Sequence, residues 1–147
     1  MPAVPPPLYA LGAALVQHRL AGPTSPSLLR GAAAGVIGAA SGTLIAGSIA
    51  RFRSRRTTVE PFQPAKASAL VTDGPNAITR NPMYVGMAGL LLAHAVGRGS
   101  WAAVLPVAGF VVVIDRLQIR PEEAALQDLF GEEYAAYCAR VPRWVVR

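Results

Sequence analysis

Cysteine and charge are both scarce in this chain of 147 residues. Cys138 is the single cysteine, which excludes an internal disulfide and a cysteine-rich zinc site. His18 and His94 have no second ligand at metal-binding spacing, so we expect no metal site. Charged residues make up only 15% of the chain and hydrophobic residues 52%, whereas globular proteins carry about 25% charged residues. So few charges would not cover a soluble surface, and the composition favours a membrane protein.

The net charge of +6 comes mainly from arginines that lie just outside apolar blocks. This distribution is typical of the cytoplasmic loops of membrane proteins. No basic stripe with interleaved aromatic residues is present, so we expect no nucleic-acid partner. Residues 1–7 lack the basic start of a signal peptide, and the apolar blocks are therefore expected to be retained. The abundance of alanine, arginine and glycine is typical of GC-rich bacteria, which predicts a bacterial cell membrane as the location.

Apolar blocks predict an all-α integral membrane protein with three to four transmembrane helices. In the first part, residues 1–56, the block 31–50 has about the 20 residues that a bilayer crossing needs. Gly38 and Gly42 form a small-xxx-small pair, which lets helices approach closely in lipid. The shorter block 8–20 predicts either a first span or an interfacial helix. We expect this part to serve packing and anchoring.

The second part, residues 57–147, is predicted to form the functional core. Its apolar segments 82–97 and 101–117 are separated by a turn so short that they must form an antiparallel helical hairpin. Pro106 is expected to kink the second arm.

From Pro121 onward the chain is charged, and its apolar residues recur every three or four positions. This spacing predicts an amphipathic C-terminal helix that bends or breaks at Gly131 and ends at Pro142. Most arginines lie in the loop that begins with 51–56 and in the tail after Arg116. One hairpin separates these segments, so they share a side of the membrane, and the excess of arginine predicts that this side is cytoplasmic.

Two polar segments flank the predicted hairpin, Ser68–Tyr84 and Arg116–Glu123. The first contains L-V-T-D-G-P and T-R-N-P-M-Y-V-G, the second ends in E-E, and F-G-E-E-Y and R-V-P-R-W follow. In this order the motifs resemble the isoprenylcysteine carboxyl methyltransferases and the membrane phospholipid methyltransferases, over residues 57–144. The resemblance implies an integral-membrane enzyme that transfers a methyl group from S-adenosylmethionine to a lipophilic or amphipathic small molecule.

The same resemblance implies a cofactor site where the polar loop, the start of the hairpin and the final helix meet. The implied contacts are Ser68, Ala69, Leu70, Val71, Asn76, Asn81, Pro82, Met83, Tyr84, Glu122 and Glu123. The isoprenylcysteine enzymes usually carry tyrosine in place of Asn76 and often histidine in place of Asn81. These departures argue against a prenylcysteine substrate.

The residues themselves allow both a functional and a structural interpretation. Glu122 can accept hydrogen bonds from the cofactor amino group or ribose, or it can simply complement the dipole of the helix it begins. Arg116 and Arg120 are the predicted catalytic residues, because forked hydrogen bonds from a guanidinium would orient a carboxylate acceptor. As interfacial arginines they would need no function. A carboxylate acceptor needs no general base, and neither polar segment contains histidine.

Two other functions stay open at this point. Residues 134–142 also resemble the end of the sterol reductases, which bind NADPH through a related hairpin. The small-residue face around Gly38 and Gly42 would alternatively serve a membrane scaffold without enzymatic activity.

Overall fold

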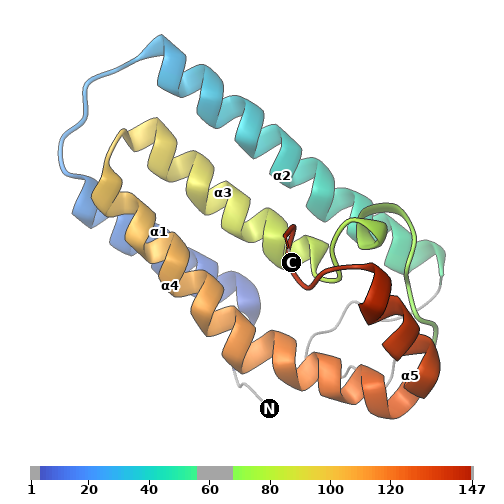
Figure 1. Cartoon of the computed structure of the whole chain (residues 1–147). Coiled ribbons are helices and arrows are strands. Elements are labelled where there is room, and N and C mark those ends of the chain that lie inside the picture. Colours follow the sequence, from blue (N-terminus) through green and yellow to red (C-terminus); the bar gives the residue numbers. More distant parts are fainter. Residues whose placement is uncertain (1–3, 56–67, 147) are drawn as a thin grey trace.

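All regular structure in residues 4–55 and 68–146, which the computed structural model describes, is helical. The main helices are α1 (Pro6–Ala21), α2 (Leu28–Ser54), α3 (Pro82–Arg98), α4 (Leu105–Ile114) and α5 (Arg120–Arg140). Shorter turns are η2 (Gly74–Ala77), η3 (Trp101–Val104) and η4 (Asp115–Ile119). Figure 1 shows α2 beside α3 and α1 beside α4, and these pairs are in contact. The all-α prediction is confirmed, whereas the predicted division of the chain after residue 56 falls outside the described residues.

Two helical stretches of the described chain are long and apolar enough to cross a bilayer by length and composition, Leu28–Ser54 and Trp101–Arg140. The first contains the predicted block 31–50 and extends it at both ends. With 16 and 17 residues, α1 and α3 fall short of the usual length of a span. The number of three or four spans therefore stays a prediction.

The close approach of α2 and α3 depends on glycines of α3. A Cβ at Gly89 would overlap the side chain of Ser41, and one at Gly86 would overlap Ile45. Of the predicted small-residue pair on α2, a Cβ at Gly38 would meet Ala93 in ordinary contact at 3.9 Å, and one at Gly42 would meet nothing within 4 Å. The tight packing face is thus internal to the bundle and is made mainly by α3.

The predicted hairpin is formed by α3 and α4. Gly99 closes α3 in the left-handed conformation, with φ of 61°, which glycine adopts without strain. Pro106 lies in the first turn of α4, directly after η3. Pro106 thus lies inside the second arm, where the turn η3 passes into α4 and where a proline removes no hydrogen bond of α4, and the predicted kink stays a prediction.

The second arm continues into the C-terminal helix through the π turn η4. At its end the Arg120 N–H bonds the carbonyl of Asp115, five residues back. Pro121 follows and donates no N–H, so a local widening of the hydrogen-bond pattern keeps the helix continuous across it. Gly131 has φ of 48° and ψ of −119°, so the predicted bend is confirmed. The helix ends at Arg140, before Pro142 as predicted, and the amphipathic character of this helix stays a prediction.

A buried glutamine fixes α1 on the hairpin. The side-chain amide of Gln17, which is fully buried, donates to the carbonyls of Leu91 at 2.9 Å and Ala103 at 2.7 Å. Its oxygen lies 2.9 Å from Nδ1 of His94. In an apolar interior these hydrogen bonds satisfy the Gln17 amide and the two backbone carbonyls, which water cannot reach. His94 therefore has a hydrogen-bond partner on α1.

Candidate functional site

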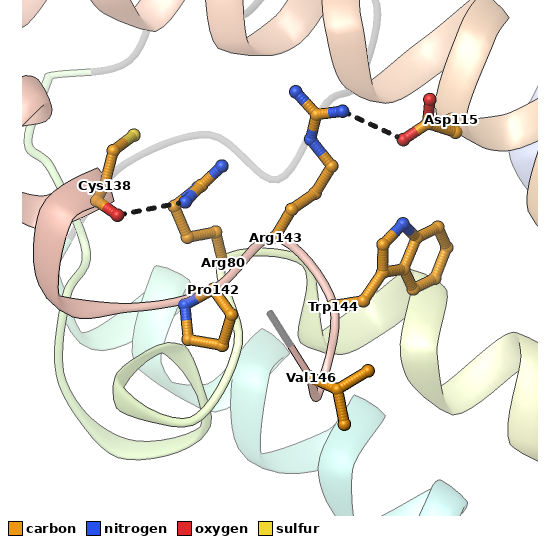
Figure 2. Close-up of a pocket in the computed structure, with 7 residues that line it drawn as sticks. All are labelled: Arg80, Asp115, Cys138, Pro142, Arg143, Trp144 and Val146. Carbon is orange, nitrogen blue, oxygen red and sulfur yellow. Dashed lines mark hydrogen bonds and ion pairs between the residues drawn. The ribbon is translucent and has the colours of Figure 1, made fainter.

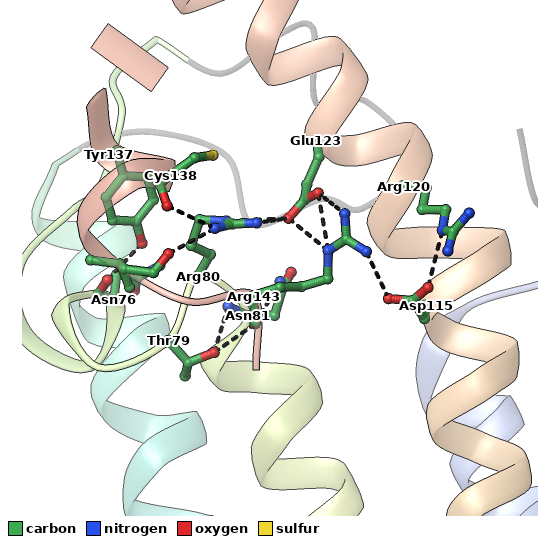
Figure 3. A network of polar contacts seen from close by, with 11 residues as sticks. Asn76, Thr79, Arg80, Asn81, Asp115, Arg120, Glu123, Tyr137, Cys138 and Arg143 are labelled. Carbon is green, nitrogen blue, oxygen red and sulfur yellow. Dashed lines mark hydrogen bonds and ion pairs between the residues drawn. The ribbon is translucent and has the colours of Figure 1, made fainter. Parts of the chain in front are cut away.

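Three polar segments meet at one end of the helical bundle, which we call the polar end. They are the loop 68–81 before α3, the region 115–123 around the π turn, and the tail 141–144 (Figure 3). Figure 1 shows α5 turning back after its bend, so that the tail runs beside the start of α3. The two segments predicted to flank the hairpin are therefore brought together, and the tail joins them.

Tyr84 and Glu122 form a hydrogen-bonded pair at this end. The Tyr84 hydroxyl donates to Oε1 of Glu122 at 2.7 Å, and the side-chain amide of Gln118 donates to the same oxygen at 2.6 Å. Tyr84 is 5% exposed and Gln118 is 1% exposed. The π turn contributes Gln118, and α3 contributes Tyr84, so the carboxylate is held from two sides.

Glu123 lies at the centre of an ion-pair network. It accepts hydrogen bonds from Arg80 at 2.8 Å and from Arg143 at 2.5 Å (Figure 3). Arg143 continues to Asp115 at 3.1 Å, and Asp115 also pairs with Arg120 at 3.1 Å. Arg116 lies 3.7 Å from the Asp115 carboxylate. Four guanidiniums thus share two carboxylates.

The charges of this network stabilise one another. Burial alone would lower the pKa of Arg80, but its hydrogen bond to Glu123 and the charge of Glu123 outweigh burial and raise the pKa above its usual value. The hydrogen bond to Glu123 likewise raises the pKa of Arg143. Both guanidiniums are therefore charged at any physiological pH.

Backbone contacts fix the tail against the loop. The backbone N–H of Arg80 donates to the Pro142 carbonyl at 2.9 Å, and its guanidinium donates to the Val141 carbonyl at 2.7 Å. Thr79 and Asn81 both donate to the Arg143 carbonyl, at 2.8 and 3.1 Å. Arg143 therefore reaches the network from a rigid backbone.

A cavity of about 430 Å³ opens beside this network. Figure 2 shows its lining, to which Arg80 and Arg143 contribute guanidiniums, Asp115 a carboxylate and Trp144 an indole ring. The lining residues are Arg80, Asp115, Cys138, Pro142, Arg143, Trp144 and Val146. The cavity thus offers both signs of charge beside an aromatic face.

The predicted cofactor contacts are distributed around the polar end, and none of them lines this cavity. Ser68 is exposed, Ala69 and Leu70 are half-buried, and Val71 is buried, with Leu70 packed against the cluster of Tyr134 and Tyr137.

In the turn η2, Asn76 is buried, and its backbone carbonyl accepts a hydrogen bond from the Tyr137 hydroxyl at 2.6 Å. Asn81 directly precedes α3, Pro82 is buried in the first turn of α3, and Met83 is half-buried beside it. The structure brings the side chains of Tyr84 and Glu122 together, whereas Glu123 is engaged by arginines.

The predicted catalytic arginines both lie at the polar end. The side chain of Arg116 is 63% exposed and that of Arg120 is 52% exposed. Each is near Asp115, a residue that the sequence-based prediction did not include. Also missed were Gln118, Arg143 and Trp144. The last two belong to the R-V-P-R-W string, whose position after the helix was the available signal.

Comparison with known proteins identifies relatives over much of the chain. A sequence model described as phospholipid methyltransferase matches residues 30–133. An uncharacterized protein of Haemophilus influenzae (strain ATCC 51907 / DSM 11121 / KW20 / Rd) is 40% identical over 63 residues, which is 43% of this chain and 100% of that relative. No solved structure matches the chain.

Proposed function

The chain belongs to the phospholipid methyltransferase family and is a membrane methyltransferase, and we propose that it transfers a methyl group from S-adenosylmethionine to a lipophilic or amphipathic acceptor. The observation that carries this proposal is the convergence of the Tyr84–Glu122 pair with the Arg80–Glu123–Arg143 network at one end of the bundle. This is the end at which the family motifs meet.

The groups at the polar end fit the chemistry of that cofactor. S-adenosylmethionine presents a carboxylate, an ammonium group, ribose hydroxyls, an adenine ring and a sulfonium, which supplies the electrophilic methyl group. Arg80 and Arg143 are engaged by Glu123, and their positive charges can attract the carboxylate of the cofactor to the cavity that they line. Glu122 can accept from an ammonium or a hydroxyl, and the Trp144 ring can cover an aromatic or cationic group. Residues 68–71, 76 and 81–84 would complete the site around them.

Arg116 and Arg120 are proposed to orient the acceptor. Both are more than half exposed, and Asp115 holds Arg120 in place by an ion pair. An acceptor that enters from the bilayer meets them at the membrane boundary, where long cationic side chains lie readily. A carboxylate acceptor is already ionised near neutral pH, so it needs only orientation and exclusion of water. We propose that this end of the bundle faces the cytoplasm, since Arg51, Arg53 and Arg55 lie at the same end of α2.

Calorimetric titration of the detergent-solubilised chain with S-adenosylmethionine tests the cofactor. We expect Glu122→Gln and Tyr84→Phe each to weaken binding by about tenfold, the usual effect of removing a buried polar contact. Glu132→Gln is the matched control, because Glu132 is an exposed carboxylate on α5 beyond the bend. Unchanged binding in both site variants would refute the proposed site. Protection against heating by NADPH, and not by S-adenosylmethionine, would favour a reductase.

A further inference from the structure

An apolar groove of about 400 Å³ lies between α1 and α4. Tyr9, Ala13 and Val16 line it from α1, and Gly109, Phe110 and Val113 line it from α4. It extends along α4 from Leu105 to Val113, on the order of 12 Å at 1.5 Å per residue. Its walls are almost wholly apolar, so a chain of methylene groups is the chemistry that matches it.

One wall of the groove comes from outside the matched part of the family. The helix α1 ends at Ala21, before the matched residues 30–133 begin. Gln17 fixes α1 on the hairpin, so the wall that α1 provides is held in place. The groove therefore depends on both α1, which lies outside the matched residues, and α4, which lies within them.

The groove leads along α4 to the polar end. Gly109, Val113 and Arg116 follow at spacings of four and three residues, which place them on one face of a helix. Arg116 thus lies beyond the end of the groove that Val113 lines, and Arg120 lies near it because both arginines are close to the Asp115 carboxylate. Their side chains are 63% and 52% exposed, so both can reach a further ligand.

Positive charge is in excess at this end of the groove. The four arginines of the network share two carboxylates, and Asp115 alone is shared by Arg116, Arg120 and Arg143. A cationic cluster at the end of an apolar groove is complementary to a molecule with one apolar chain and an anionic head group.

We propose that the acceptor site takes a single-chain anionic amphiphile, with the chain in the α1–α4 groove and the carboxylate or phosphate head group on Arg116 and Arg120. This inference rests on the proposed function, and it specifies the substrate class of the same site. The shared requirement is a negative head group on a linear apolar chain.

Binding of isotopically labelled probes to the full chain in neutral maltoside micelles tests the proposal. The probes are oleate, oleyl phosphate and oleyl alcohol, which share the chain and differ in the head group. We expect the anionic probes to bind at least about tenfold more tightly than the alcohol. The Arg116→Gln/Arg120→Gln double variant is expected to remove this preference and to leave binding of the alcohol unchanged. The ratio of oleate to oleyl phosphate distinguishes the two head groups.

Gly109→Leu tests the position of the chain. A Cβ at Gly109 meets nothing within 4 Å, so the new side chain can occupy the groove without displacing the fold. We expect it to weaken all three probes by about tenfold or more, since it displaces several methylene groups. Gly35→Leu is the matched control, because it makes the same change at an equally open, exposed glycine of α2.

The outcomes separate this inference from the proposed function. Equal binding of oleyl alcohol and oleate, or equal effects of Gly109→Leu and Gly35→Leu, overturns the inference even if S-adenosylmethionine binds normally. A change of oligomeric state in Gly109→Leu would overturn it in favour of a second copy of the chain in the groove. Selective binding of the anionic probes without any binding of S-adenosylmethionine supports the amphiphile site and refutes the methyl donor.

Discussion

Replacing Arg80 with glutamine is expected to loosen the tail from the polar end of the bundle. The side chain of Arg80 is only 11% exposed, and that of its partner Glu123 is 15% exposed. Its guanidinium bonds Glu123 and the Val141 carbonyl, at 2.8 and 2.7 Å. Glutamine keeps most of the length but carries no charge, so the variant removes the ion pair with little change in volume.

The size of the effect follows from what each partner keeps. Breaking a buried ion pair commonly costs about 3–5 kcal/mol, because the remaining charge is left without a partner. Glu123 still has Arg143 at 2.5 Å, so its share falls to roughly 1.5 kcal/mol. The Val141 carbonyl loses a short bond, which costs about 1 kcal/mol. We therefore expect the free energy of unfolding to fall by roughly 2–3 kcal/mol.

Unfolding in maltoside micelles with increasing dodecyl sulfate measures this change, with circular dichroism as the probe. Fluorescence of Trp144 in a Trp101→Phe background reports the tail separately. The control is Arg53→Gln, which alters an exposed arginine of α2 and should change stability by no more than about 0.5 kcal/mol. A loss below about 1 kcal/mol for Arg80→Gln, with unchanged Trp144 fluorescence, would refute the idea that this network holds the tail.

Three further predictions follow from the packing and the charges. Gln17→Leu should destabilise the chain by about 1–2 kcal/mol, because two carbonyls and His94 lose a partner; a neutral effect in the same micelle titration would contradict the role of this residue in fixing α1. Gly89→Ala should cost about 1–3 kcal/mol through overlap with Ser41, and adding Ser41→Gly should recover much of the loss; no recovery would place the strain elsewhere. The hydrogen bond from Arg55 lowers the pKa of Asp73 below its usual value, so this pair stabilises the fold above about pH 4 and loses its effect as the pH falls through the lowered pKa. The unfolding midpoints of the wild type and Asp73→Asn should therefore converge on acidification, and a constant difference would contradict the pairing.

Helix positions were predictable from the sequence because they depend on local patterns. The apolar block 31–50 lies within α2. The first predicted arm, 82–97, matches α3, and the second, 101–117, begins where η3 begins and continues through α4. Gly131 was recognisable as a bend, since glycine alone tolerates its left-handed conformation. The sequence did not show that Pro106 begins a new type of helix, because a proline is equally compatible with the first turn of α4 and with a helix interior that it kinks.

Contacts of the polar end depended on where distant segments meet. The order of the two motifs predicted that Tyr84 and Glu122 belong to one region, and the structure joins them by a hydrogen bond. No local pattern indicated that Asp115 would be shared by three arginines or that Arg143 would join it to Glu123. A charged residue in a sequence has many candidate partners, and only the path of the backbone selects among them.

The sequence alone thus determined that the chain is helical, suited to a membrane and built around the motifs of a methyltransferase family. Those properties depend on the length of apolar runs, on composition and on the order of short motifs, all of which are local. Only the tertiary structure decided which carboxylate accepts from Tyr84 and Gln118, which carboxylates are shared by arginines, and where the cavity and groove lie. These features depend on the π turn, on the bend at Gly131 and on the return of the tail to the start of α3, which bring together groups tens of residues apart.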